Sequence, residues 1–344
     1  MKMKIEQTKL YLAPGTYDAV NDCLAAGDLV TGSHLRKLEE LLCDRFNKSH
    51  AILTTNCFAA ICSVLNATNS GFNDSVWTSS MGTCYAVVNA IKASGNRVDF
   101  VDSTLEKLSL DGRHLPKDQH LRIVIPHHFG LVENSKVLSA KHNNFILHDY
   151  AQSALSIIDS HRHHENIVIS FYPTKWINGI DGGAFLTNDK DLASKVQDLV
   201  SYSHQMEYDT ITRYNYKLSN LHAAVAYQAM LNIDEIRCQL TETHMSLAKR
   251  LKEDGYDIVK FDDNEIPMKM LIRASDRSSA ETKISKFQEN GIGARRELGM
   301  LCQGSEKLKY VRSIENCNRI YSLPLYPNMS KNEIDYVTTV ARHV

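Results

Sequence analysis

The feature that most constrains the fold is an alternation of helix-like and strand-like segments over the first two thirds of the chain. Apolar residues recur at helical spacing in 33–47, 57–67 and 84–94. Apolar runs of strand length stand at 98–101, 121–126, 144–149, 166–172 and 183–187. Strands that alternate with helices favour a parallel, doubly wound sheet, which binds ligands at the carboxyl ends of its strands.

The last third of the chain has a different pattern. Its helical segments fit 218–233, 238–254, 279–290 and 330–342, and its strand-like segments fit 256–261 and 268–274. We therefore predict a large α/β domain over 1–235 and a smaller α+β domain over 236–344. No Gly/Ser-rich linker separates them, so a long helix is the expected hinge. The N-terminal residues belong to the large domain in this division, with the option of packing on the smaller one.

The charge balance and the hydropathy pattern exclude several classes of partner. The formal net charge is −1, so no global field attracts nucleic acid or an acidic membrane. No apolar run reaches the ~18 residues of a membrane span, and the first residues lack the apolar segment of a signal peptide. The eight cysteines form no CxxC pair and no zinc-like spacing, which suggests a reducing compartment. We expect a cytoplasmic protein.

The side chains that could take part in catalysis concentrate at the ends of two predicted strands and just after them. Asp149 ends one apolar run, Ser170 lies near the end of the next, and Lys175 follows in the connection before Gly182 and Gly183. An amine that forms an imine, a carboxylate and a phosphate-binding hydroxyl are the groups that pyridoxal 5'-phosphate (PLP) chemistry needs. From spacing alone the alternatives stay open, because an Asp after a strand is commonly a turn residue and a loop lysine is commonly solvated.

Three short motifs in this stretch resemble those of the DegT/DnrJ/EryC1/StrS family, the PLP-dependent sugar aminotransferases. They read D-Y-A-Q at 149–152, S-F-Y-P-T-K at 170–175 and G-G at 182–183. Further segments that are similar to the family's follow the family's order: TGSHLRKLEELLCDRF at 31–46, RYNYKLSNLHAAVAYQAML at 213–231 and SLPLYPNMSKNEIDYV at 322–337. Several motifs in one order over nearly the whole chain are more specific than any one motif.

The resemblance implies the fold of type I PLP-dependent transferases: a mainly parallel seven-stranded sheet flanked by helices, with a smaller C-terminal α+β domain. It implies that Lys175 forms the imine with PLP and moves protons, and that Asp149 pairs with the ring nitrogen. The other implied cofactor contacts are Gln152 at the ring hydroxyl, Ala151 on a ring face, Ser170 at the phosphate, and Asn215 at the phosphate of the neighbouring subunit. The active unit would then be a homodimer with shared active sites.

Two segments depart from the family pattern. Where the family has S-G-T at the start of the phosphate-binding helix, this chain has Asn56, Cys57 and Phe58. The backbone donors remain, but a hydroxyl is lost; the alternative is that 57–62 is only a buried helix face. Where the family stacks an aromatic residue on the ring, Cys84 precedes Tyr85, so either Tyr85 takes this role or the stack is absent.

Candidate substrate residues come from three positions. His128 lies in a segment similar to the family's H-x-Y-G-Q, and Arg295 and Arg296 lie where the small domain can face substrate, as partners for a diphosphate. An exposed turn is an equally good explanation of the arginine pair. The histidines at 161, 163 and 164 lack regularly spaced Cys or carboxylate ligands, so we predict a solvated loop and no metal.

The function that the resemblance implies is an aminotransferase that passes an amino group, from glutamate, to a nucleotide-linked keto-deoxysugar. Another keto acceptor such as a cyclitol stays open, since fold and cofactor do not fix the substrate. A degenerate PLP-fold protein without catalysis is the third alternative, and the presence of Lys175, Asp149, Gln152 and Ser170 together argues against it. The sequence contains no G-x-G-x-x-G motif, so a nicotinamide oxidoreductase has no support from it.

Overall fold

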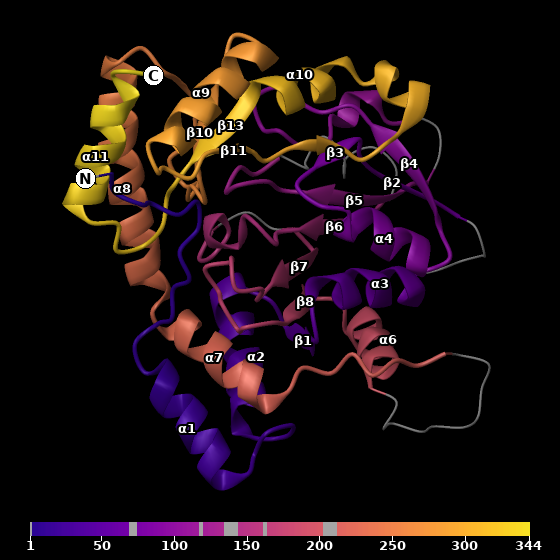
Figure 1. Cartoon of the computed structure of the whole chain (residues 1–344). Helices are drawn as coiled ribbons and strands as arrows, with labels where there is room; N and C mark the ends of the chain where they lie inside the picture. The colour runs from indigo at the N-terminus through magenta and orange to yellow at the C-terminus, as the bar shows by residue number, and fades with distance from the viewer. Residues whose placement is uncertain (1, 69–73, 117–119, 134–143, 161–163, 202–211) are drawn as a thin grey trace.

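The fold consists of a large mixed sheet covered by helices and a smaller antiparallel sheet beside it (Figure 1). The structure, a computed structural model, describes residues 2–68, 74–116, 120–133, 144–160, 164–201 and 212–344. In the described ranges, no helix is both long and apolar enough to cross a membrane.

The large sheet has seven strands in the order β1-β8-β7-β6-β5-β2-β4. Their bounds are β1 (His50–Thr54), β2 (Ser75–Ser79), β4 (Arg97–Val101), β5 (Arg122–Pro126), β6 (Phe145–Asp149), β7 (Asn166–Ser170) and β8 (Gly183–Thr187). The strands from β4 to β7 run parallel, whereas β8 is antiparallel to both β7 and β1. The predicted mainly parallel, seven-stranded sheet is confirmed.

Helices cover both faces of this sheet because its strands are apolar on both sides. Along β7, Val168 packs in one core cluster while Ile167 and Ile169 pack in the other, as strand alternation requires. The first cluster includes side chains of α3 (Cys57–Ala67), α4 (Ala86–Ala93) and α6 (Lys190–Val200); the second includes those of α2 (Ser33–Phe46) and α7 (Asn220–Leu231). This two-sided cover leaves the strand ends as the place for a ligand.

The smaller sheet is antiparallel throughout and has the order β11-β13-β10-β9. Its strands are β9 (Asp257–Ile258), β10 (Met270–Arg273), β11 (Arg295–Arg296) and β13 (Ile320–Leu323). The helices around it are α8 (Ile233–Glu253), α9 (Arg277–Glu289), α10 (Val311–Arg319) and α11 (Lys331–Ala341). The boundary predicted between residues 235 and 236 falls in the first turn of α8, and it stays a prediction.

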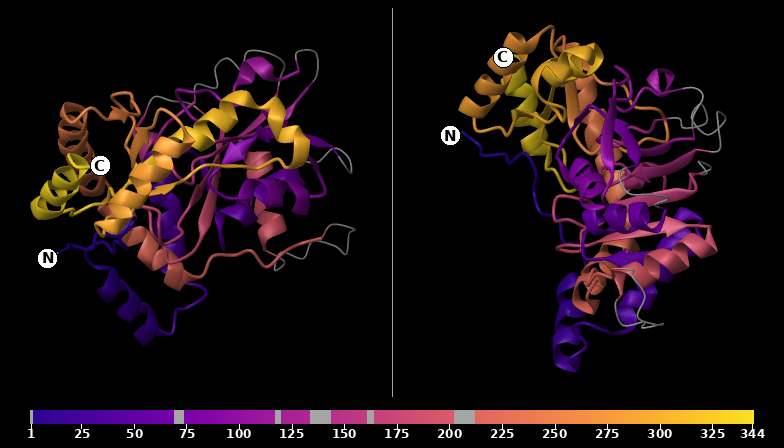
Figure 2. Two further views of the ribbon diagram at one scale, coloured as in Figure 1. Left: turned by 45° about the horizontal axis from the view of Figure 1, so that its top comes forward. Right: turned by 90° about the vertical axis from the view of Figure 1, so that its right-hand side faces the viewer.

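Backbone hydrogen bonds tie the region of the smaller sheet to distant parts of the chain in two places described here. The short strands β3 (Met81–Gly82) and β12 (Gly299–Met300) pair with each other. The N-terminal segment runs to the smaller sheet, where Ile5 exchanges backbone hydrogen bonds with Gly291 and Gly293. Both termini accordingly lie beside α11 (Figures 1 and 2). This contact places the N-terminal segment beside the smaller sheet, while the division into two domains stays a prediction.

Several elements were not predicted from the sequence. They are α1 (Thr16–Ala26), β1, β2, α6, α10, β13 and the two-residue strands β3, β11 and β12, together with 3-10 turns at Gly112–His114, Ala154–Ser156 and Gly304–Lys309. In β2 the sequence is SVWTS and in α6 it is KDLASKVQDLV, so polar residues dilute the apolar pattern of both. For α8, predicted from 238, the structure places the start at Ile233, directly after α7.

Candidate active site

Asp149, Ser170 and Lys175 meet at one edge of the large sheet. Asp149 ends β6 and Ser170 ends the neighbouring parallel strand β7, so both lie at the carboxyl edge. A turn in which the Lys175 N–H donates to the Tyr172 carbonyl at 2.8 Å then brings the lysine back to this edge. All three residues line one cavity of about 390 Å³. The sequence prediction thus selected side chains that the fold brings together.

The start of α3 forms another wall of this cavity. Asn56 caps the helix, since its Oδ1 accepts the Ala59 N–H at 2.8 Å, and Asn56, Cys57 and Phe58 all line the cavity. Gly183 permits the close approach of β8, because a Cβ there would lie 2.6 Å from the Cys57 nitrogen. A helix start carries partial positive charge, which suits a phosphate dianion. The segment is therefore both a buried helix, from Ala59 onward, and a cavity wall.

Asp149 is buried, and Lys175 is half-buried at the cavity wall. Burial raises the pKa of Asp149, while the Ala151 N–H, which donates to Oδ1 at 2.9 Å, and the charge of Lys175 lower it. Burial lowers the pKa of Lys175, and Asp149 opposes this shift. A buried carboxylate of this kind favours a cationic partner such as a protonated pyridine nitrogen. The lowered pKa shifts the amine toward its neutral, nucleophilic form.

Unpaired polar atoms also face this cavity. Among the described residues, Thr78 Oγ1 and His128 Nε2 are buried without a hydrogen-bond partner, and both residues line the cavity. Burial lowers the pKa of His128 to about 4, so its imidazole is neutral at neutral pH. Such atoms are normally satisfied in proteins, and here a polar ligand can satisfy them. The residues present therefore fit a group with the size and polarity of PLP.

Gln152 and Ala151 lie beside this group of residues. Gln152 lines the cavity, and its side-chain amide donates to Thr83 Oγ1 at 3.0 Å and accepts the Phe129 N–H at 3.3 Å. These bonds hold the amide at the cavity wall, and its contact with the ring hydroxyl stays a prediction. Ala151 lines the cavity as well.

The two predicted arginines point to different places. Arg295 lines the cavity, whereas Arg296 faces Glu281 with an N–O separation of 3.7 Å and does not line it. The two residues form strand β11, in which successive side chains point to opposite faces. Arg296 therefore does not line this cavity, and its role toward substrate stays a prediction, whereas Arg295 lies where a substrate could reach it.

Tyr85 and Asn215 also lie outside the cavity. Tyr85 is 46% exposed and its hydroxyl donates to the Met300 carbonyl at 3.3 Å, while its neighbour Cys84 lines the cavity instead. Tyr85 does not line the cavity, because α4 begins directly after it and its side chain is directed toward β12, so its contact with the cofactor stays a prediction. Asn215 is exposed beside the end of α6, so its contact with a neighbouring subunit stays a prediction.

Sequence reasoning missed several lining residues: Tyr172, Thr174, Asp181, Glu297 and Leu301. Of these residues, Glu297 is the one that the sequence could have indicated. It lies two residues after Arg295, which is the spacing of side chains on one face of an extended segment.

The predicted histidine loop lies partly outside the described residues, which leave out 161 and 163. His164 is described: it hydrogen-bonds to the Tyr150 hydroxyl and stacks on His148 with ring centroids 4.0 Å apart. Within the described ranges, no group of three or more His, Cys, Asp or Glu side chains is placed to hold a metal ion.

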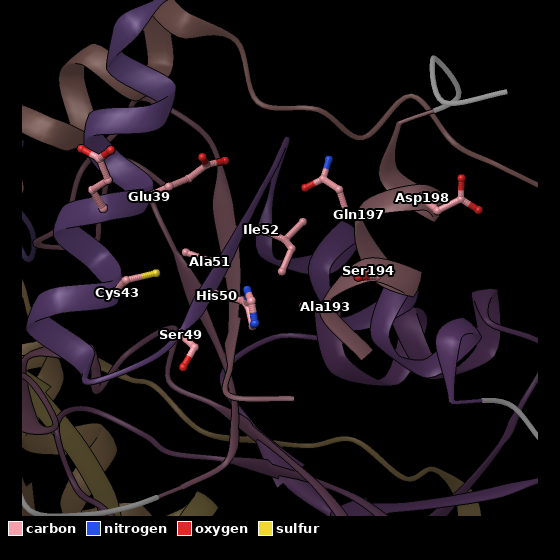
Figure 3. A pocket seen from close by; sticks show the side chains of 11 residues that line it. Glu39, Cys43, Ser49, His50, Ala51, Ile52, Ala193, Ser194, Gln197 and Asp198 are labelled. Atoms are coloured by element: carbon pink, nitrogen blue, oxygen red, sulfur yellow. The ribbon is translucent and has the colours of Figure 1, made fainter. Parts of the chain in front are cut away.

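A second hollow, of about 640 Å³, lies between α2, the edge strand β1 and α6 (Figure 3). Its acidic lining residues are Glu39, Glu40 and Asp198, and burial together with Glu40 raises the pKa of Glu39 to about 7. No Lys or Arg stands among its described lining residues. An anionic ligand therefore has no counter-charge there, and we assign the chemistry to the first cavity.

Comparison with known proteins agrees with this geometry. The sequence model of the DegT/DnrJ/EryC1/StrS aminotransferase family matches residues 13–342. A DegT DnrJ EryC1 StrS aminotransferase from Brucella abortus superposes with a TM-score of 0.85 at 20% identity, covering 95% of this chain and 94% of that one. PseC of Helicobacter pylori, an aminotransferase involved in the biosynthesis of pseudoaminic acid, gives 0.88 at 17% identity, covering 98% of both chains. DesI, crystallised in the presence of its TDP-sugar product, gives 0.83 at 19% identity, covering 100% and 93%.

Proposed function

The chain belongs to the DegT/DnrJ/EryC1/StrS aminotransferase family, whose members depend on PLP, and from this premise we propose that it transfers an amino group from glutamate to a nucleotide-linked keto-deoxysugar. The observation that carries the proposal is the convergence of Lys175, Asp149 and the start of α3 on one cavity that also holds Arg295. The first three can bind the cofactor, and the arginine can bind an anionic substrate.

The chain's own residues divide the work around the cofactor, which when bound supplies the electron sink for the reaction. Lys175 Nζ holds the cofactor and later takes and returns a proton, and its lowered pKa favours the neutral amine that this requires. Asp149 keeps the ring nitrogen protonated. Ser170 and the first turn of α3 bind the phosphate, and Gln152 orients the ring from the side of its hydroxyl.

Support for a nucleotide-linked substrate comes from Arg295. Its side chain is 58% exposed and only its Nε is engaged, by Glu297 at 3.1 Å, within the described chain. The terminal nitrogens are left to bind a diphosphate in the bidentate manner that suits a guanidinium. DesI was crystallised in the presence of its TDP-sugar product, and TDP-sugars belong to the class of nucleotide-linked sugars proposed here.

We place this reaction in a homodimer with shared active sites in the cytoplasm. Asn215 carries the dimer proposal: it is exposed on the single chain and stands next to Tyr216, whose carbonyl accepts the Thr55 N–H directly before the start of α3. A neighbouring subunit bound at this edge would bring its own Asn215 toward the opposite phosphate site.

The test is an absorbance spectrum of the purified protein with PLP, before and after glutamate is added. We expect the visible band of a lysine-bound cofactor and its loss when glutamate converts the cofactor to its amine form. Lys175→Ala removes the band, whereas Lys190→Ala, at the exposed start of α6, keeps it. A wild-type protein that shows no band in saturating PLP would contradict the proposal. Conversion of TDP-linked 4-keto-6-deoxyglucose to an aminosugar then tests the acceptor.

A further inference from the structure

We propose that Glu297 determines acceptor specificity: its carboxylate accepts a hydrogen bond from a hydroxyl of the sugar ring. The assignment rests on the proposed function and adds a residue that the cofactor does not require. Glu297 lines the same cavity as Lys175 but comes from the segment after β11, not from the large sheet.

One oxygen of this carboxylate is fully occupied by the protein. Glu297 Oε1 accepts from Ser322 Oγ at 2.8 Å, from Arg295 Nε at 3.1 Å and from Gln7 Nε2 at 3.2 Å. Its side chain is only 8% exposed. Donors from three separate segments therefore hold the carboxylate in one orientation, as a preorganised binding group requires.

The other oxygen is left for a ligand. In the described part of the chain, no group donates to Glu297 Oε2, although the residue lies at the cavity surface. Among the described residues, Glu297 Oε2 is not one of the fully buried polar atoms that lack a partner, so it reaches the solvent in the cavity. A hydroxyl of a bound ligand can replace water as its donor there.

The charge of Glu297 is maintained in its buried position. Burial by itself raises the pKa of this carboxyl, but the hydrogen bond from Arg295 and the positive charge of Lys269 outweigh it, so the net pKa is lowered. Lys269 is buried and in turn anchors the N-terminal segment, donating to the Gln7 carbonyl at 3.1 Å. At neutral pH Glu297 is therefore ionised and acts only as an acceptor.

An acceptor at this position selects a class of partner. It repels a phosphate or a carboxylate and attracts a donor, and the donors of a keto-sugar are its hydroxyl groups. Arg295 lies next to it with free terminal nitrogens directed to the outside. An inner acceptor followed by an outer cation matches the order of groups in a nucleotide sugar, in which the hydroxyl-bearing ring precedes the diphosphate.

The test compares the binding of TDP-glucose with that of TDP, by calorimetry on the PLP-loaded protein. Glu297→Gln keeps the shape of the side chain but exchanges one acceptor for a donor. We expect affinity for TDP-glucose to fall about tenfold or more, as for loss of a hydrogen bond to a charged group, and affinity for TDP to stay within about twofold. Glu281→Gln, at a surface carboxylate on α9, is the matched control and leaves both affinities unchanged.

Two results overturn the assignment. One is an unchanged affinity of Glu297→Gln for TDP-glucose, and the other is an equal loss for TDP and TDP-glucose, which marks a general disturbance. Glu297→Asp keeps the charge beside Arg295 and withdraws the free oxygen, so the same selective loss is expected if the Gln variant does not fold. A wild-type protein that binds neither TDP-glucose nor UDP-glucose rejects the nucleotide-sugar class itself, and the role of Glu297 with it.

Discussion

Asp149 and Lys175 lie in one buried cavity, and burial shifts the pKa of each toward its neutral form while their opposite charges resist the shift. In both residues the effect of burial is the larger one. The cavity is therefore electrostatically unfavourable for its own charged groups until a ligand compensates them. This relationship predicts opposite effects on stability and on activity when the carboxylate is removed.

Asp149→Asn should stabilise the cofactor-free protein and impair the reaction. Because the folded-state pKa of Asp149 is raised, the folded state binds more protons than the unfolded state between the two values, and stability falls as pH rises through them. At neutral pH the neutral amide avoids this cost, so the free energy of unfolding in urea should increase. The glutamate half-reaction should slow by roughly 10²-fold, because the ring nitrogen loses its counter-charge.

The control for this prediction is Asp263→Asn, at an exposed residue of the connection before β10. It should change neither the free energy of unfolding nor the rate of the glutamate half-reaction. A less stable cofactor-free Asp149→Asn protein would show that the Ala151 N–H and Lys175 outweigh burial, contrary to the direction argued above.

Gly183→Ala should loosen the phosphate end of the site. The new Cβ would lie 2.6 Å from the Cys57 nitrogen and 2.8 Å from its Cα, and these are backbone atoms that cannot move aside independently. We expect a loss of about 1–3 kcal/mol in the free energy of unfolding, as for overpacking, and weaker PLP binding. Fluorescence titration with PLP and urea denaturation measure the two effects.

Gly299→Ala is the matched substitution, since a Cβ there meets no atom within 4 Å. It should leave stability and PLP affinity nearly unchanged. Equal behaviour of the two variants would refute the close approach of β8 to α3 as the reason for glycine at 183.

The parts of the site that follow from sequence are those that lie on buried strands. Asp149 and Ser170 end or follow continuous apolar runs, so their place at the carboxyl edge could be derived from the pattern alone. The role of Lys175 needed the family resemblance, because the turn that returns it to the edge has no apolar pattern.

Glu297 could not be derived in this way. Its orientation depends on Gln7, which is 290 residues away in sequence, and on Ser322 of β13, a strand that was not predicted. Arg296 and Tyr85 are the opposite case, because the sequence places them near the site and the fold places them outside the cavity. Both stand next to a cavity residue in sequence, but strand alternation and the start of α4 turn their side chains away.

Lys269 offers a pH-dependent test of the support beneath Glu297. Burial lowers the pKa of Lys269 to about 8, against the attraction of Glu297, while its ordinary value is 10.5. Between these values the unfolded chain binds more protons than the folded one, so the contribution of Lys269 to stability rises with pH over this window.

Relative to Lys269→Met, which cannot titrate, the free energy of unfolding of the wild-type protein should therefore increase by about 3 kcal/mol from pH 7.5 to 10.5. Urea denaturation across this range measures the difference. If the difference for Lys269→Met were constant, Lys269 would titrate like a solvated lysine, and the buried charge assumed beneath Gln7 and Glu297 would not exist.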